Sequence, residues 1–254
     1  MSTGIRIRGV YGQLQISDDV AINSVLYSGN LGTIVAYPAG GGITFYATGV
    51  TFPQVITTTE QPLVFVRVTN SVTIYSARII GQPGAWTGFS ISGTTLNTNV
   101  GNGTATVPVY GTWFISTTQA GKSNARYGIR IRNPNTGAIV FDSGFPIAKF
   151  LSWTPQFVNG RVVSHGHDNS GNDMWWDWYS ADAPIPYAYN GHFILNGFTG
   201  AITGGTYKYA SNMYLTFDVN TPYTMNVQIM CQAGQGPSIF GPNAWNLVWA
   251  TPGP

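Results

Sequence analysis

The side chains best suited to chemistry are concentrated in residues 164–179, Ser-His-Gly-His-Asp-Asn-Ser-Gly-Asn-Asp-Met-Trp-Trp-Asp-Trp-Tyr. This segment combines two histidines with three aspartates and three tryptophans. Histidines and carboxylates bind metals, aromatic rings beside carboxylates bind sugars, and large aromatic side chains also fill cores. All three interpretations remain open from the sequence. The candidate ligand- or receptor-binding residues are His165, His167, Asp168, Asp173, Trp176, Asp177, Trp178 and Tyr179.

A metal site would need three or four converging ligands. His165 and His167 lie two residues apart, on one face of a strand, and His192 with an aspartate would have to complete the set. Residues 168–173 form an Asp/Asn-rich stretch, but they lack the central glycine and the distal glutamate of a calcium-binding EF-hand loop. The sequence therefore predicts no bound metal and no cofactor.

The aromatic residues of this segment support two other interpretations. In an extended strand, Trp176 and Trp178 fall on one face, and Trp175 and Asp177 on the other. One face can then pack while the other stacks on a host glycan, as in a lectin-like carbohydrate-binding module. In that interpretation residues 164–179 are exposed, for example as a loop. Alternatively these rings belong to the core, and Asp177 caps a turn or pairs with Arg161.

Catalysis has little support in the sequence. Glu60 is the only glutamate, and no Gly-x-Ser-x-Gly motif is present. Cys231 lies in an apolar strand pattern typical of a core residue. The triplet Gly121-Lys122-Ser123 is not a phosphate-binding loop, because Ser116 occupies the required upstream glycine position. We therefore expect a protein that is not an enzyme.

The element around which the chain is organised is a predicted hairpin over residues 127–144. Ile129-Arg-Ile-Arg132 alternates between an apolar face, expected in the core, and an arginine face. Residues 133–137, Asn-Pro-Asn-Thr-Gly, form the turn, and residues 138–141 return. The pentapeptide Gly-Ile-Arg-Ile-Arg also opens the chain, at residues 4–8. The arginines are either solvated or paired with acids of a neighbouring subunit; these assembly candidates are Arg6, Arg8, Arg130 and Arg132.

This stretch carries a family resemblance. Its Tyr-Gly-Ile-Arg-Ile-Arg strand, Asn/Gly turn and Phe-Asp-Ser return resemble a hairpin that recurs in tail and tail-tip proteins of long-tailed, siphovirus-like bacteriophages. The likeness covers residues 127–144 and, more loosely, residues 4–20. It implies a virion structural protein, and it assigns no active-site residue.

Charged residues make up only 8% of the chain, against roughly 25% in ordinary soluble domains. A subunit buried in an assembly needs less surface charge than a free monomer, so we expect a homo-oligomer. A net charge of +2 gives no nucleic-acid-binding patch. We also expect no signal peptide and no membrane insertion, since no apolar run approaches about 20 residues.

Short strand patterns separated by Gly, Pro and Asn turns dominate the chain, and helical spacing is almost absent. The predicted strands outside the central hairpin are 5–8, 14–16, 33–37, 43–47, 63–69, 72–80, 87–92, 104–110, 112–117, 192–195, 206–209, 214–219, 223–230 and 247–250. This pattern predicts an all-β fold, an antiparallel β-sandwich or a jelly-roll-like fold. The repeated hairpin predicts two tandem β domains, residues 1–125 and 126–254.

Together these observations predict a bacteriophage virion protein, a minor tail, tail-tip or baseplate component made in the host cytoplasm. It would act by assembly with other tail proteins, and by contact with a glycan or protein receptor on the host surface. The alternatives are a carbohydrate-binding module that uses residues 164–179 and a head decoration protein.

Overall fold

The structure of the protein is a computed structural model. It describes residues 4–9, 12–17, 21–38, 44–68, 72–94, 105–108, 111–154, 162–167, 173–182, 191–196, 201–202, 211–217, 224–232 and 247–253. Within these residues the chain forms twenty β-strands and no helix, hence no helix of the length and apolarity that crossing a membrane requires. All their pairings are antiparallel. The predicted all-β, antiparallel fold is confirmed.

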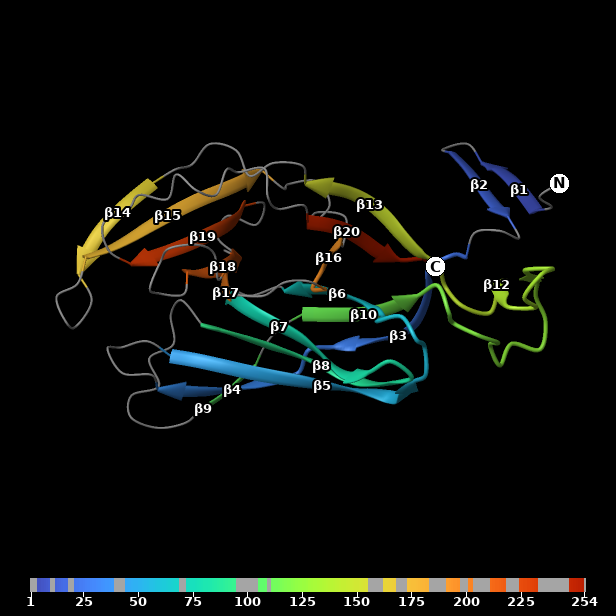
Figure 1. The fold of residues 1–254 in the computed structure, drawn as a ribbon, viewed down its shortest axis with the longest axis horizontal. Coiled ribbons are helices and arrows are strands. Elements are labelled where there is room, and N and C mark those ends of the chain that lie inside the picture. The colour runs from blue at the N-terminus through green and yellow to red at the C-terminus, as the bar shows by residue number, and fades with distance from the viewer. Residues whose placement is uncertain are drawn as a thin grey trace.

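Six strands form the first large sheet, in the spatial order β13-β20-β16-β6-β10-β3. They are β3 (Ser24–Asn30), β6 (Leu63–Val68), β10 (Gly111–Thr117), β13 (Ala148–Thr154), β16 (His192–Ile194) and β20 (Leu247–Pro252). Strands from the two halves of the chain therefore lie next to each other in this sheet, since β6 is the neighbour of β16 (Figure 1).

The second large sheet has ten strands, in the order β14-β15-β19-β18-β7-β8-β5-β4-β9, with β17 paired to β18. They are β4 (Thr33–Pro38), β5 (Thr44–Ile56), β7 (Val72–Gln82), β8 (Ala85–Thr94), β9 (Ala105–Pro108), β14 (Val162–His167), β15 (Asp173–Asp182), β17 (Ala201–Ile202), β18 (Ser211–Phe217) and β19 (Thr224–Gln232).

Two hairpins form separate two-stranded sheets. One pairs β1 (Gly4–Gly9) with β2 (Gly12–Ser17), and the other pairs β11 (Arg130–Arg132) with β12 (Ile139–Asp142). Both lie at one end of the molecule, and β14 and β15 lie at the opposite end (Figure 1). The two copies of Gly-Ile-Arg-Ile-Arg are thus both used in hairpins.

The predicted boundary between residues 125 and 126 does not separate the two sheets. β6, from the first half of the chain, pairs with β10 on one side and with β16, from the second half, on the other. Likewise β7 pairs with β18 in the second sheet. The Asn196 side chain adds to this connection, because its Oδ1 accepts the N–H of Val64 at 2.7 Å.

Strand β10 is buried on both faces, since residues 113–117 are all buried. Side chains alternate along a strand, so Trp113 and Phe114 project from opposite faces. The Trp113 ring lies 5.6 Å from that of Phe89 on β8 and 6.3 Å from that of Phe52 on β5. The first sheet therefore contacts the second through aromatic rings, as the layers of a β-sandwich do.

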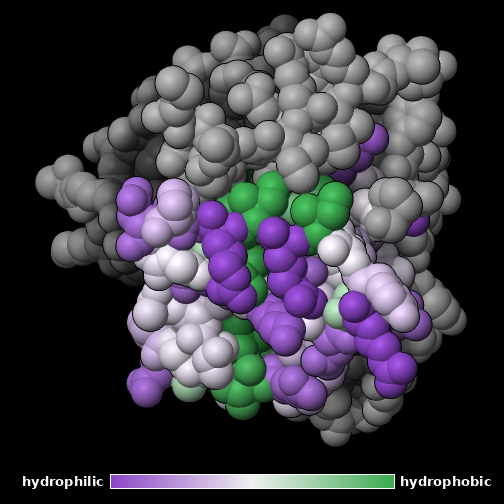
Figure 2. Space-filling view, turned by 90° about the vertical axis from the view of Figure 1, so that its right-hand side faces the viewer, coloured by the Kyte–Doolittle hydropathy of each residue, from purple (hydrophilic) through white to green (hydrophobic). Residues whose placement is uncertain are grey.

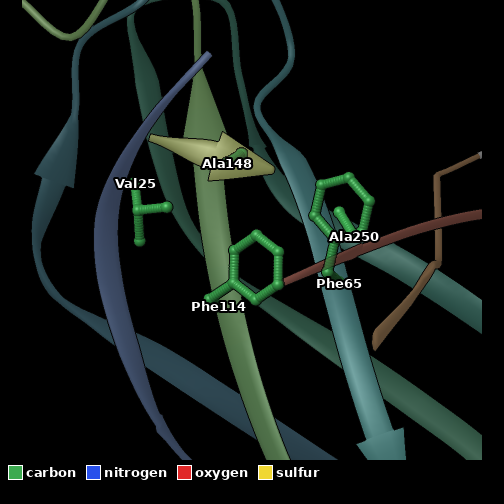
Figure 3. Close-up of a cluster of buried hydrophobic side chains, with 5 residues drawn as sticks. All are labelled: Val25, Phe65, Phe114, Ala148 and Ala250. Carbon is green, nitrogen blue, oxygen red and sulfur yellow. The ribbon is translucent and has the colours of Figure 1, made fainter. Parts of the chain in front are cut away.

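The opposite face of β10 belongs to a second part of the core. Phe114 stacks on Phe65 of β6 with ring centroids 4.7 Å apart. Val25, Ala148 and Ala250 complete this buried cluster, which draws on five strands of the same sheet (Figure 3). One sheet supplies all of these side chains, so it has to curl around them.

Backbone contacts near the start of β3 show how far the sheet curls. Ser24 forms an antiparallel bridge with Ile147, immediately before β13. The Val25 N–H also donates to the carbonyl of Pro146 at 2.8 Å. These bonds connect β3 to the residues that lead into β13, the outermost strand on the other side of the spatial order, and they fix the chain on the C-terminal side of the β11–β12 hairpin.

Two of the longer strands, β3 and β13, have no predicted counterpart. Their sequences mix Ser, Gly or Lys with aromatic residues, and paired neighbours in the sheet outweigh this weak local preference. For segment 164–179 the sequence left both an extended strand and an exposed loop open, and the segment is largely a hairpin of β14 and β15. The predicted strand 206–209 lies outside the described residues.

Phe89→Ala tests the contact between the sheets. Phe89 is fully buried, so its truncation should lower the free energy of unfolding by about 3–5 kcal/mol in denaturant melts. Val55→Ala is the control, because Val55 is 53% exposed, and it should change stability by about 0.5 kcal/mol or less. Equal, small losses in both variants would contradict the packing described.

Candidate interaction site on the hairpin of residues 121–146

A buried carboxylate, that of Asp142, joins the hairpin to the loop that precedes it. Its side chain is 3% exposed. Oδ1 accepts the Ser123 hydroxyl at 2.9 Å and the Gly144 N–H at 2.8 Å. Oδ2 accepts the Ser123 N–H at 2.9 Å and the Nε–H of Arg130 at 2.6 Å. These four donors satisfy the carboxylate, as a buried charge requires.

Arg130 extends this network to the loop backbone. Its Nη2 donates to the carbonyl of Ser123 at 3.3 Å and to that of Ala125 at 3.1 Å. The arginine side chain is 30% exposed, so the ion pair with Asp142 is only partly shielded from water. One guanidinium group therefore holds together both strands of the hairpin and residues 123–125.

The electrostatics favour a structural role for this carboxylate. Burial by itself raises the pKa of Asp142, but the hydrogen bonds from Arg130, Ser123 and Gly144 outweigh burial and hold the pKa well below its usual range. A general base works best with a pKa near the working pH. Asp142 is therefore an anchor for the loop that stays ionised at neutral pH, and it is unsuited to proton transfer.

The turn of the hairpin forms as its sequence predicts. Oδ1 of Asn133 accepts the N–H groups of Asn135 at 2.9 Å and Thr136 at 3.1 Å. Gly137 adopts a φ of 71°, in the left-handed region that glycine enters without strain. The Arg132 Nη1 donates to the Gly137 carbonyl at 2.8 Å. Side-chain and backbone bonds together fix the tip.

The hairpin is attached to the rest of the molecule through β12. Val140 and Phe141 are buried, and the Val140 carbonyl accepts the N–H of Ile22 at 3.1 Å. At the other side, a Cβ atom at Gly144 would collide with the Ser123 hydroxyl, so the loop and the end of the hairpin fit closely. The hairpin is thus positioned relative to the core at both of its ends.

The outer side of the hairpin exposes an unusual combination of residues. Tyr127 is 92% exposed and Ile129 is 51% exposed. Lys122, Arg126 and Arg132 are also exposed. At this end of the molecule, a small group of hydrophobic residues lies among hydrophilic ones (Figure 2). An exposed tyrosine and isoleucine beside positive charges are suited to binding another protein.

The predicted faces of the hairpin need correction. Val140 and Phe141 of the return strand are buried, but Ile129 is half exposed, so the isoleucine face is not a core face along its length as predicted. Arg130 is not simply solvated, since its partner is Asp142 of the same chain. The reason is that β11 has only three residues and pairs only with β12 among the described strands, so a polar network holds the hairpin where apolar packing ends.

The other arginines of the predicted assembly set are placed only in part. Arg6 and Arg8 lie on β1, with Gln15 and Gln13 as their cross-strand neighbours. An acid therefore stands opposite Arg130 but not opposite Arg6. The site also includes Ser123, Tyr127 and Asp142, which are not among the site residues predicted from the sequence. Asp142 could have been found, because the register of the predicted hairpin places it opposite Arg130.

The β14–β15 hairpin, which carries the predicted ligand residues other than Asp168, lies at the other end of the molecule (Figure 1). His165 and His167 are on β14, and the other candidates except Asp168 are on β15; these are Asp173, Trp176, Asp177, Trp178 and Tyr179. The register places His167 opposite Asp173, and Trp176 opposite Ser164. Asp168 lies outside the described residues. Trp176 and Trp178 both belong to β15, so they fall on one face of that strand, as expected from the sequence.

His192 does not join these histidines in the same sheet. It lies on β16, where its Nε2 is 2.9 Å from the Thr112 hydroxyl and its ring meets that of Phe114 edge-on at 5.1 Å. Its environment is therefore that of a core histidine. Within the part of the chain that is described, no three His, Cys, Asp or Glu residues gather as a metal site would require.

Comparison with known proteins adds no further constraint. No protein-family model, curated protein or solved structure matches this chain. The function of this chain is therefore inferred from its own residues and their geometry.

Arg130→Ala should destabilise the protein, because it leaves the buried Asp142 carboxylate without its counter-ion. Hydrogen bonds to a charged group contribute about 1.5–3 kcal/mol, and we expect a loss at the lower end of that range because the arginine is partly exposed. Denaturant melts measure the loss. Arg126→Ala removes an exposed arginine three residues from Ser123 and should be neutral. A neutral Arg130→Ala would show that the network does not stabilise the fold.

The lowered pKa of Asp142 predicts a specific acid response. The native carboxyl holds its proton less tightly than the unfolded one, so its stabilisation is fully present above the unfolded pKa of about 3.9. It is lost as the pH falls through the native pKa. Wild-type stability should therefore fall more steeply below about pH 4 than that of Asp142→Asn, measured by melts across pH. Parallel pH curves would contradict the lowered pKa.

Proposed function

We propose that this protein is a structural component of a bacteriophage virion, positioned in the tail, tail tip or baseplate, and that it acts by assembly rather than catalysis. The single observation that carries the proposal is the outer side of the 121–146 hairpin. It holds an exposed Tyr127 and Ile129 on a backbone fixed by Asp142 and Arg130. Preorganised apolar and aromatic side chains of this kind favour protein association.

The composition supports the same function. With 8% charged residues the chain has few groups that keep free monomers apart in solution. Phe150 and Leu151, on the outermost strand β13, add to the exposed apolar side chains at 47% and 38% exposure. Residues 127–144 also carry the resemblance to phage tail proteins described above. An assembled particle would cover such surfaces.

Two measurements test this function. The isolated chain should sediment as species larger than its 27.3 kDa monomer at micromolar concentration, and Tyr127→Ala should shift the distribution toward monomer. Tyr127 is almost fully exposed, so the variant should keep the wild-type melting temperature. Electron microscopy of particles carrying a tagged copy should place the tag on the tail. A stable wild-type monomer, or particles without the tag, would contradict the proposal.

A further inference from the structure

The charges of this chain are few, and they are segregated. Four of the eleven Lys and Arg residues lie within residues 122–132, and Asp142 is the only acid within 121–144, so this hairpin has a net charge of +3. Four of the nine acids lie within residues 168–182, and Arg161 is the only Lys or Arg in 161–182, so that segment has a net charge of −3 with neutral histidines. The two segments have equal and opposite charge.

The positive charge of the 121–146 hairpin is available to a partner. Asp142 is neutralised internally by Arg130, so it does not offset the other basic residues. Lys122, Arg126 and Arg132 are exposed, and they lie close in sequence to the exposed Tyr127 and Ile129. We call these five residues the basic patch. The patch requires a partner that is acidic and offers apolar or aromatic surface.

The β14–β15 hairpin has these two properties in its sequence and register. Asp173 and Asp177 lie four residues apart on β15 and so share one face of the strand with Trp175. β14 is the outermost strand of the ten-stranded sheet, and only its pairing with β15 is found among the described strands. Acidic and aromatic residues therefore lie together near a sheet edge.

The two hairpins lie at opposite ends of the molecule (Figure 1). They cannot meet within one copy, but they can meet between two. A contact between different surfaces of identical chains is head-to-tail, and it leaves one unoccupied surface on each end of a pair. Such contacts continue until a ring closes or an open chain grows.

We propose that the basic patch of one copy binds the acidic β14–β15 hairpin of a second copy, giving head-to-tail association. This names the partner within the proposed assembly function, and so it rests on that function. A nucleic acid is a poorer fit, because duplex binding typically uses about 6–10 phosphate contacts and the patch offers three exposed basic residues.

Charge reversal tests this contact directly. Lys122→Glu with Arg126→Glu should weaken self-association about tenfold or more in sedimentation equilibrium, because like charges then face each other. The matched control is Arg78→Glu with Lys149→Glu, which reverses two exposed charges on β7 and β13 and should leave the association near the wild-type value. Equal weakening in both double variants would show a general charge effect and overturn the proposal.

Complementary variants provide a second arm. Asp173→Lys with Asp177→Lys should also fail to self-associate, but an equimolar mixture with Lys122→Glu/Arg126→Glu should restore association, since each contact again joins opposite charges. A mixture that stays dissociated contradicts the contact. If the lysine variant does not fold, the Lys122→Glu/Arg126→Glu chain is mixed with wild-type protein instead. This chain keeps an unaltered β15, so it should bind the basic patch of a wild-type chain and terminate wild-type assemblies. The absence of such binding would overturn the proposal.

These outcomes separate this inference from the function on which it rests. If the wild-type chain associates and the Lys122→Glu/Arg126→Glu variant associates equally well, the head-to-tail contact is contradicted and the assembly function still stands. Wild-type chains that do not associate would contradict both. A gel-shift with duplex DNA that depends on Lys122 and Arg126, without self-association, would replace the second copy by a nucleic acid as the partner.

Discussion

Strand β10 is buried on both faces, and this burial determines how the two large sheets are arranged. A strand in an ordinary two-layer fold packs on one face, but here Trp113 faces the ten-stranded sheet while Phe114 faces the interior of its own sheet. The first contact brings β5 and β8 against the six-stranded sheet. The second requires that sheet to curl until β3 is bonded to the chain before β13. Both layers are therefore positioned by consecutive residues of one strand.

The hairpin follows from the same arrangement. The chain leaves β10 at Thr117 and re-enters the same sheet at Ala148, so both ends of the intervening segment are fixed in the core. Its buried hydrophobic residues are Val140 and Phe141 of β12. The ion pair between the buried Asp142 and the partly exposed Arg130 holds the preceding loop. Asp142 accepts the N–H groups of Ser123 and Gly144. The neighbouring aromatic, apolar and basic side chains are exposed and can contact a partner. The exposed surface thus has a structural origin.

Sequence patterns predicted what depends on local order. The hairpin turn is specified by Asn133, Pro134 and Gly137, whose conformational preferences act over a few residues, and strands with regular alternation were recognised for the same reason. The pairing of β6 with β16 in one sheet could not be predicted, because these strands lie more than a hundred residues apart in the sequence. The exposure of Ile129 was likewise missed, since periodicity assigns a face but not its neighbour.

The Asp142 carboxylate preorganises the hairpin in the isolated chain. Amide hydrogen exchange tests this preorganisation most directly, because the N–H groups of Ser123 and Gly144 donate to that carboxylate. We predict that both amides are protected in the isolated wild-type protein and exchange rapidly in Asp142→Ala, while the Phe114 amide in β10 stays protected in both. Unprotected Ser123 and Gly144 amides in the wild type, beside a protected Phe114, would contradict the account.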